Sequence, residues 1–236
     1  MPGVELQIIA GGGIAAPLRE IAAAFEGASG HRLVMRFGTT PELVTMATRL
    51  PSFDAGVVPH EVLHNAAARA TFAPAPMPDI ARVGIGVAVR AGAPKPDIST
   101  PEALKQALLA ARAIASIPAS ATGTQLARIY ERLGIAEAMQ IKTRAQAAPQ
   151  QIIDAIVNGD AELAVFLLNV LNDRRLEVVG PFPSAVQGEV VYAAGVAARA
   201  NEPGAAKAFV EYLVTPAAAA VIRAMGMVPC GGEPHP

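Results

Sequence analysis

The sequence predicts an α/β protein in which most strands are parallel. Short β-prone runs alternate along the chain with segments of helical length, as in folds built from successive strand and helix units. The connections between them are rich in Gly, Ser, Thr and Pro. With 236 residues, 52% of them hydrophobic and 17% charged, the chain can bury one large core or two modest ones.

The first third of the chain repeats the order strand, turn, helix three times. Each apolar run ends in a short turn that leads into a helical pattern. In the second turn, Thr precedes Pro-Glu, which is typical of a helix start. The expected strands are 6–10, 33–37 and 54–58, and the turns after them are Gly11–Gly13, Thr39–Thr40 and Pro59–Glu61.

The rest of the chain continues the alternation after a break. Residues 73–78 contain three prolines and end the regular pattern, and 83–90 then predicts a long strand that crosses to a second part of the molecule. Residues 118–124 form a polar turn of small residues before a helix that Gly134 ends. Further strands are expected at 113–117, 163–168, 177–179 and 190–196, and further helices at 104–109, 125–133, 150–158, 204–213 and 216–224.

The glycine turn indicates a small negatively charged ligand. A helix that follows Gly11, Gly12 and Gly13 presents unpaired amides and the positive end of its dipole to whatever lies in front of it. The alternative is that these glycines only make a tight connection. Neither G-x-G-x-x-G nor G-x-x-x-x-G-K-[ST] occurs in the chain, which disfavours a dinucleotide or nucleoside triphosphate.

Composition argues against two classes of partner. The formal net charge is -1, only 4% of residues are aromatic and there is no Trp, so nucleic acid is not expected as a ligand. No apolar run reaches the roughly 18 residues that a membrane-spanning helix needs, so membrane insertion is not expected either.

The N-terminus and the cysteine bear on the compartment. Residues 1–5 lack the basic and apolar regions of a signal peptide, so the sequence as written predicts a cytoplasmic protein, or a periplasmic one if a signal peptide was removed. The single Cys230 cannot form an internal disulfide, and its loop surroundings do not favour a catalytic thiol.

The C-terminal region carries a resemblance to a known family. Residues 205–217, AAKAFVEYLVTPA, followed by 221–229, VIRAMGMVP, resemble the closing helices of type II periplasmic binding proteins, particularly the molybdate-binding branch. The resemblance implies a two-lobed fold with a ligand cleft between the lobes. It assigns 1–82 and 190–236 to lobe I and 83–189 to lobe II.

The same resemblance implies which turns meet at the ligand. Each candidate also has a structural interpretation: Thr39 and Thr40 can cap their helix, and Asn169 can be a buried amide with its hydrogen bonds satisfied. Hydroxyls and amides suit an oxyanion and need no cofactor. The candidate ligand-binding residues are Gly11, Gly12, Gly13, Ile14, Thr39, Thr40, Ser120, Thr122, Gly123, Thr124 and Asn169.

The chain departs from the molybdate pattern at two turns. Molybdate binders usually place serines in the first turn, where this chain has glycine and Ile14, and their contacts include no titratable group. Here His60 and Glu61 stand at a turn of the expected cleft, and an imidazole can take and return a proton near neutral pH. His64 lies one helical turn further on, but no third ligand is evident, so no metal site is expected. Tyr192 is a second candidate proton donor, or a core residue.

Two functional classes remain open. One is an isomerase that moves a double bond in a small di- or tricarboxylate, because the family that this chain resembles includes aconitate isomerase-like members. Its candidate catalytic residues are His60, Glu61 and Tyr192. The other is the substrate-binding component of an ABC importer for molybdate or a similar anion, which would have a membrane permease as its partner. A small anion is the ligand in both cases.

Overall fold

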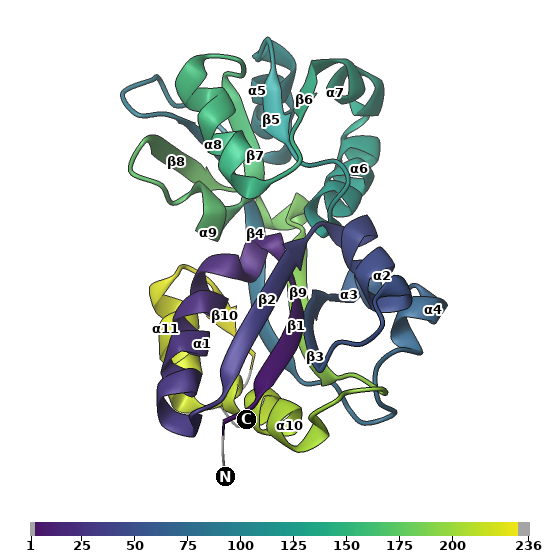
Figure 1. Cartoon of the computed structure of the whole chain (residues 1–236). Coiled ribbons are helices and arrows are strands. Elements are labelled where there is room, and N and C mark those ends of the chain that lie inside the picture. The colour runs from purple at the N-terminus through teal and green to yellow at the C-terminus, as the bar shows by residue number, and fades with distance from the viewer. Residues whose placement is uncertain (1–2, 231–236) are drawn as a thin grey trace. The chain divides into compact units, whose positions relative to one another are not determined.

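The computed structural model describes residues 3–230 and divides the chain into two compact units. The first unit extends to Arg82 and resumes at Val191, and the second comprises Val83–Val190. The chain passes from one unit to the other along two strands, β4 (Asp79–Arg90) and β9 (Glu189–Val196). Each unit has its own set of paired strands and its own helices (Figure 1).

In the first unit three parallel strands lie side by side in the order β2, β1, β3, and β9 follows β3. The central strand β1 pairs in parallel with β2 and β3, with Gly11 opposite Gly38 and Ala10 opposite Val57. β9 runs antiparallel to β3, and the short β10 pairs with the first part of β4. The strand bounds are β1 Glu5–Gly11, β2 Arg32–Gly38, β3 Ala55–Pro59 and β10 Val228–Pro229.

Helices cover both faces of this sheet. α1 and α11 lie together on one side, and α2, α3 and α4 lie on the other (Figure 1). The ring of Phe25 from α1 packs edge-on against Phe209 and Tyr212 of α10, at centroid distances of 5.2 and 5.4 Å. The helices are α1 Ala15–Ser29, α2 Thr40–Arg49, α3 His60–Leu63, α4 Ala66–Arg69, α10 Pro203–Tyr212 and α11 Pro216–Ala224.

A buried carboxylate ties this unit together. Asp54, only 1% exposed, accepts hydrogen bonds from the backbone N–H of Gln7 at 2.8 Å, Asn201 at 2.8 Å and Glu202 at 3.1 Å. These donors come from β1 and from the start of α10, which lie far apart in the sequence. A buried charge is tolerated only when it is hydrogen-bonded, and Asp54 meets that condition.

The sheet of the second unit is mixed. β5 pairs in parallel with β6 and β7, whereas β7 and β8 both run antiparallel to β4. The expectation of mostly parallel sheets is therefore wrong, because the strands that connect the units run against their neighbours. The bounds are β5 Ile114–Ser116, β6 Thr143–Ala145, β7 Leu163–Leu167 and β8 Leu176–Pro181.

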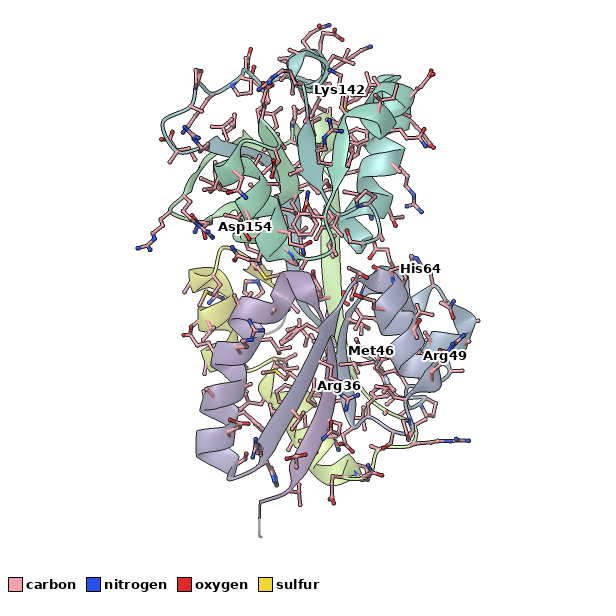
Figure 2. The ribbon with its side chains drawn as sticks, turned by 45° about the horizontal axis from the view of Figure 1, so that its top comes forward. Arg36, Met46, Arg49, His64, Lys142 and Asp154 are labelled. Carbon is pink, nitrogen blue, oxygen red and sulfur yellow. The ribbon has the colours of Figure 1, made fainter. Side chains whose placement is uncertain are left out.

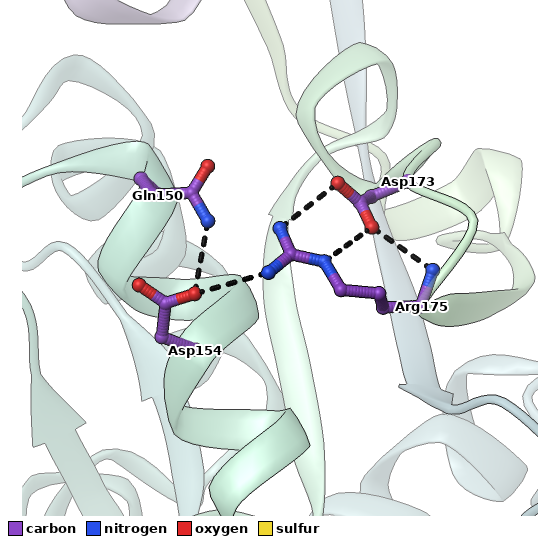
Figure 3. Close-up of polar contacts among 4 residues, drawn as sticks. All are labelled: Gln150, Asp154, Asp173 and Arg175. Atoms are coloured by element: carbon purple, nitrogen blue, oxygen red, sulfur yellow. Dashed lines mark hydrogen bonds and ion pairs between the residues drawn. The ribbon is translucent and has the colours of Figure 1, made fainter.

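The core of the second unit lies between this sheet and its helices. It includes Ile114 from the sheet together with Leu104, Leu126, Ile129 and Met139 from three helices. A surface cluster links α8 to the segment before β8, where Arg175 binds Asp173 and Asp154, and Gln150 binds the same Asp154 (Figure 3). The helices are α5 Pro101–Ala110, α6 Ala121–Leu133, α7 Ala136–Lys142, α8 Pro149–Asn158 and α9 Leu168–Leu171.

Candidate functional site

Three sequence-predicted turns lie on one edge of the sheet in the first unit. Because β1, β2 and β3 are parallel and in register, their carboxyl ends meet at the same edge. In open α/β sheets this edge is where ligands bind. The structure therefore brings together the turn after β1, the start of α2 and the start of α3. The predicted site residues there are Gly11, Gly12, Gly13, Ile14, Thr39, Thr40, His60 and Glu61.

The glycine turn is a 3-10 turn, Gly12–Ile14, that leads directly into α1. None of its glycines has a positive φ, so left-handed backbone is not why glycine stands here. Space is the reason at Gly11: a Cβ there would lie 2.7 Å from Cε1 of Tyr192. The backbone can thus approach the aromatic ring closely, and the first amides of the turn stand at the sheet edge without an intervening side chain.

The two threonines of the second turn differ in what their hydroxyls contact. Thr39 is the N-cap of α2, and its backbone N–H and hydroxyl both donate to Oε2 of Glu42, at 2.7 and 2.8 Å. These bonds, the backbone one first, lower the pKa of Glu42 and keep it ionised. The hydroxyl of Thr40 is buried and has no hydrogen-bond partner among residues 3–230. Thr40 is therefore better placed than Thr39 to bind a ligand.

His60 has a carboxylate partner that the sequence did not indicate. Nε2 of His60 lies 2.6 Å from Oδ1 of Asp79, the first residue of β4, and the two side chains are 42% and 45% exposed. The pair is therefore accessible from outside the core. A carboxylate only accepts, so Nε2 carries the proton and the tautomer with a lone pair on Nδ1 is favoured.

The neighbouring histidine takes no part in this pair. His64 is exposed at the end of α3, where its N–H bonds to the carbonyl of His60 at 3.2 Å (Figure 2). Within residues 3–230 no group of three or more His, Cys, Asp or Glu could hold a metal ion. The third ligand that a His60 and His64 site would need is thus missing from the described residues.

Tyr192 is a buried phenol that is influenced by the charge of Glu61. Tyr192 lies on β9 opposite Pro59 of β3, and its side chain is buried beside Gly11. Burial, and then the negative charge of Glu61, raise the pKa of the Tyr192 hydroxyl well above its usual range. Tyr192 is therefore a neutral phenol at physiological pH. The structure shows it as a packing residue, with a carboxylate close enough to affect it.

The second unit has its own carboxyl edge. β5 and β7 are adjacent and parallel, so the segments that follow them begin at the same edge. Ser120, Thr122, Gly123 and Thr124 follow β5, and Asn169 follows β7. All five are neutral.

The predicted hydroxyl-rich turn is in fact the beginning of α6. The helix starts at Ala121, four residues earlier than expected, because Ser120 caps it: its hydroxyl accepts from the N–H of Gly123 at 3.0 Å and donates to the carbonyl of Ile117 at 2.6 Å. Thr122 is 1% exposed. At Gly123 a Cβ would lie 2.0 Å from the carbonyl oxygen of Pro118, so only glycine fits.

The last two polar residues of this edge are helical. Thr124 is exposed, and its N–H and hydroxyl both donate to the carbonyl of Ser120, at 3.0 and 3.3 Å. The strand expected at 163–168 is one residue shorter in the structure. β7 ends at Leu167, and Asn169 is the second residue of α9, with a buried Oδ1 atom.

A comparison with protein families defines the class of this protein. A model described as bacterial extracellular solute-binding protein matches residues 6–228, so the chain belongs to this family of solute-binding proteins. Among curated proteins, an aconitate isomerase from Pseudomonas sp is 31% identical over 242 residues, a match that covers 99% of this chain and 91% of the relative. The resemblance to type II periplasmic binding proteins is confirmed.

Solved structures confirm the two-lobed α/β fold of such proteins. The Azotobacter vinelandii periplasmic molybdate-binding protein matches with a TM-score of 0.76 and 18% identity, over 98% of this chain and 100% of that one. A periplasmic thiamin binding protein gives 0.77 and 16%, over 98% and 85%. The sulfate-binding protein of Mycobacterium tuberculosis gives 0.74 and 16%, over 96% and 87%. At these identities the match concerns the fold alone.

Two further expectations concern location. The family is extracellular by description, and the comparisons give no support to a cytoplasmic protein. No single helix between residues 3 and 230 is long and apolar enough to cross a membrane, although α10 and α11, bent by 59°, satisfy length and composition as a pair. Phe209 and Ile222 of that pair are fully buried in the first unit.

Proposed function

We propose that this protein binds a small di- or tricarboxylate and moves its double bond by proton transfer, as an aconitate isomerase does. The observation that carries the proposal is the 31% identity to the Pseudomonas aconitate isomerase across 99% of this chain. The contact between His60 and Asp79 at the edge of the first unit supports it, because a receptor that only binds an anion needs no proton carrier.

Carboxylate binding is assigned to the glycine turn and to Thr40. The amides at Gly12–Ile14 and the dipole of α1 favour a negative group, and the unpartnered hydroxyl of Thr40 can donate to it. Thr39 contributes less, because its donors are already bound to Glu42. In the second unit, Thr122, Gly123 and Asn169 are proposed to bind the same ligand, and Ser120 and Thr124 to hold the start of α6. The cleft between the lobes stays a prediction.

His60 is proposed as the base. Asp79 holds Nε2, so Nδ1 can take an allylic proton from the substrate, and Asp79 stabilises the imidazolium that forms. The electron pair of the broken C–H bond spreads over an allylic anion, which amides at the helix starts stabilise. His60 then returns the proton to the other end of the anion, and the double bond has moved. Glu61 is the alternative base, and Tyr192 the second donor.

Proton NMR tests this proposal directly. We expect each aconitate isomer, incubated with the protein in D2O, to convert to the other and to exchange an allylic proton for deuterium. Heat-denatured protein is the control for spontaneous isomerisation. If the folded protein gives neither conversion nor exchange with aconitate or other unsaturated di- and tricarboxylates, the proposed isomerase activity is wrong.

The second candidate function is the substrate-binding component of an ABC importer. The all-neutral edge of the second unit favours it, because hydroxyls and amides suffice to bind an oxyanion such as molybdate. This function requires a periplasmic location and a permease as partner. A thermal-shift screen separates the two candidates: stabilisation by micromolar molybdate, tungstate or sulfate, without proton exchange on any organic acid, would favour the receptor.

A further inference from the structure

The second unit contains a cavity that is lined, except at Gly123, by residues to which the proposed function gives no role. Its volume is about 600 Å³, and it lies among β5, β6, α6 and α7. Of the candidate ligand-binding residues only Gly123 lines it, and Ser120, Thr122 and Asn169 do not. The cavity is large enough for a molecule of ten to fifteen heavy atoms, by the ordinary range of small-molecule sites.

A buried hydroxyl without a partner lies in the lining of this cavity. Ser116, the last residue of β5, is 3% exposed, and its Oγ atom has no hydrogen-bond partner within the described part of the chain. Its backbone carbonyl accepts a hydrogen bond from the N–H of Gln146 at 2.8 Å, so the atom without a partner belongs to the side chain. Residues two apart on a strand share a face, which puts Ser116 on the side of the core residue Ile114. A buried polar atom is costly unless it is bonded, so a ligand that bonds Oγ would be stabilised.

The walls next to Ser116 are apolar. Leu126 and Tyr130 come from α6, and Met139 comes from α7, and all three are largely buried. Burial raises the pKa of the Tyr130 phenol, so the ring stays neutral. These side chains offer contact to a hydrocarbon or aromatic body but do not compensate a charge.

The charge of the lining has one sign. Glu131 of α6 and Glu137 of α7 line the cavity, both are exposed, and no Lys or Arg is among the lining residues. Three cations that are close to lining residues in the sequence are directed elsewhere. Arg132, next to Glu131, donates to the carbonyl of Val186 at 3.5 Å. Lys142 donates to the carbonyls of Leu109 and Ala111, at 2.8 and 2.7 Å (Figure 2), and Arg144 stands between the lining residues Thr143 and Ala145, so it points to the opposite face of β6.

We propose that this cavity is a second ligand site, for a small organic cation with an apolar body and a hydroxyl group. Glu131 and Glu137 would bind the ammonium group, the side chains of Leu126, Tyr130 and Met139 would contact the body, and Ser116 would bond the hydroxyl. A hydroxylated aryl amine such as tyramine carries all three features. The site is independent of isomerase activity, because its ligand is a cation and it lies outside the proposed catalytic residues.

Isothermal titration with three probes tests this site. Tyramine is expected to bind more tightly than phenethylamine, which lacks the hydroxyl, and than 2-(4-hydroxyphenyl)ethanol, which lacks the amine. The loss of one hydrogen bond corresponds to about a five-fold weaker affinity. Equal affinity for the three probes, tighter binding of the anion 4-hydroxyphenylacetate, or no binding of tyramine at millimolar concentration would overturn the proposal.

Variants assign the contacts. Ser116→Ala is expected to weaken tyramine about five-fold and to leave phenethylamine unchanged. The double variant Glu131→Gln, Glu137→Gln is expected to weaken both amines and to leave the uncharged alcohol unchanged. Glu102→Gln, an exposed carboxylate of α5 outside the cavity, is the matched control. The site as proposed is wrong if Ser116→Ala lowers the affinity for both amines equally. It is also wrong if the double glutamate variant lowers the affinity for neither amine. Both conclusions hold whatever the outcome with aconitate.

Discussion

The carboxyl edges of the two units are built alike but carry different chemistry. In each unit, parallel strands end at one edge and short helices begin there, which places several amides and hydroxyls together. At the edge of the first unit the contact between His60 and Asp79 accompanies them, together with Glu61 and the buried Tyr192. At the edge of the second unit, every predicted site residue is neutral.

This difference separates binding from catalysis. Neutral donors recognise charge and shape but cannot carry a proton, whereas a histidine held by a carboxylate can. If the protein is an isomerase, changes at the first edge should lower turnover, and changes at the second edge should affect ligand affinity or stability. If it is a receptor, the two edges should contribute to affinity alike.

The largest effect is expected for His60→Ala. Loss of a positioned base lowers turnover by about 10²- to 10⁴-fold, whereas carboxylate affinity should change little because amides and hydroxyls bind the anion. Aconitate conversion followed by NMR, with titration calorimetry for binding, measures both. His64→Ala removes an exposed histidine of the same helix and is the control. Full turnover in His60→Ala would assign the base elsewhere, with Glu61 as the next candidate.

Asp79→Asn should have the second largest effect. The amide can keep the contact with Nε2 but no longer stabilises the imidazolium, so kcat is expected to fall roughly 10- to 100-fold while KM stays near its original value. Asp79→Glu should restore part of the rate, because a carboxylate is again within reach. If the fall in kcat instead follows the fall in melting temperature in both variants, the pair only holds α3 to β4.

Thr40→Val isolates the hydroxyl that has no partner. Its removal should lower carboxylate affinity about five-fold, the equivalent of one hydrogen bond, and should leave the melting temperature unchanged or slightly higher. The stability is expected not to fall because no bond within the protein is lost. Unchanged affinity for every anion tested would exclude Thr40 from the binding site.

Local sequence signals predicted the elements that place the first edge. The apolar runs and the turns at Gly11–Gly13 and Thr39–Thr40 are found where the sequence puts them, because each depends on residues close together in the chain. The start of α6 was misplaced although its signal is also local. Thr122, Gly123 and Thr124 are typical turn residues, but the hydroxyl of Ser120 caps the helix and outweighs their composition.

The partners of the titratable groups could not be predicted. Asp79 is 19 residues from His60 and follows a proline-rich segment, so no spacing rule relates the two. Tyr192 lies opposite Pro59 only because β9 returns to the first unit antiparallel to β3. The catalytic roles of these residues stay predictions, because the geometry shows which side chains are neighbours and not which group transfers a proton.

Ser120→Ala removes a hydroxyl at the edge of the second unit, as Thr40→Val does at the edge of the first unit. Ser120 both accepts from Gly123 and donates to Ile117, so its loss should lower the free energy of unfolding by about 1 kcal/mol, the usual cost of an N-cap. Ligand affinity should stay nearly constant. Chemical denaturation and calorimetry measure the two effects, and a loss of affinity without a loss of stability would make Ser120 a ligand contact.

The smallest effect is expected for the acid dependence of the Arg175 cluster in the second unit (Figure 3). Hydrogen bonds from Arg175, the side-chain ones first, lower the pKa of Asp173 below its ordinary value, so the folded state holds the ionised carboxylate more strongly than the unfolded state does. The stabilisation is therefore present above about pH 4 and is lost as the pH falls through the lowered pKa. Arg175→Gln should lower the melting temperature slightly at pH 7, and the difference from the unchanged protein should shrink below pH 4.

The effect of Arg175→Gln is small because water screens the partly exposed pair of Arg175 and Asp173. Lys207→Gln, which removes an exposed ion pair with Glu211 in the first unit, is the control. A difference that grows toward low pH would show that Arg175 acts through another group.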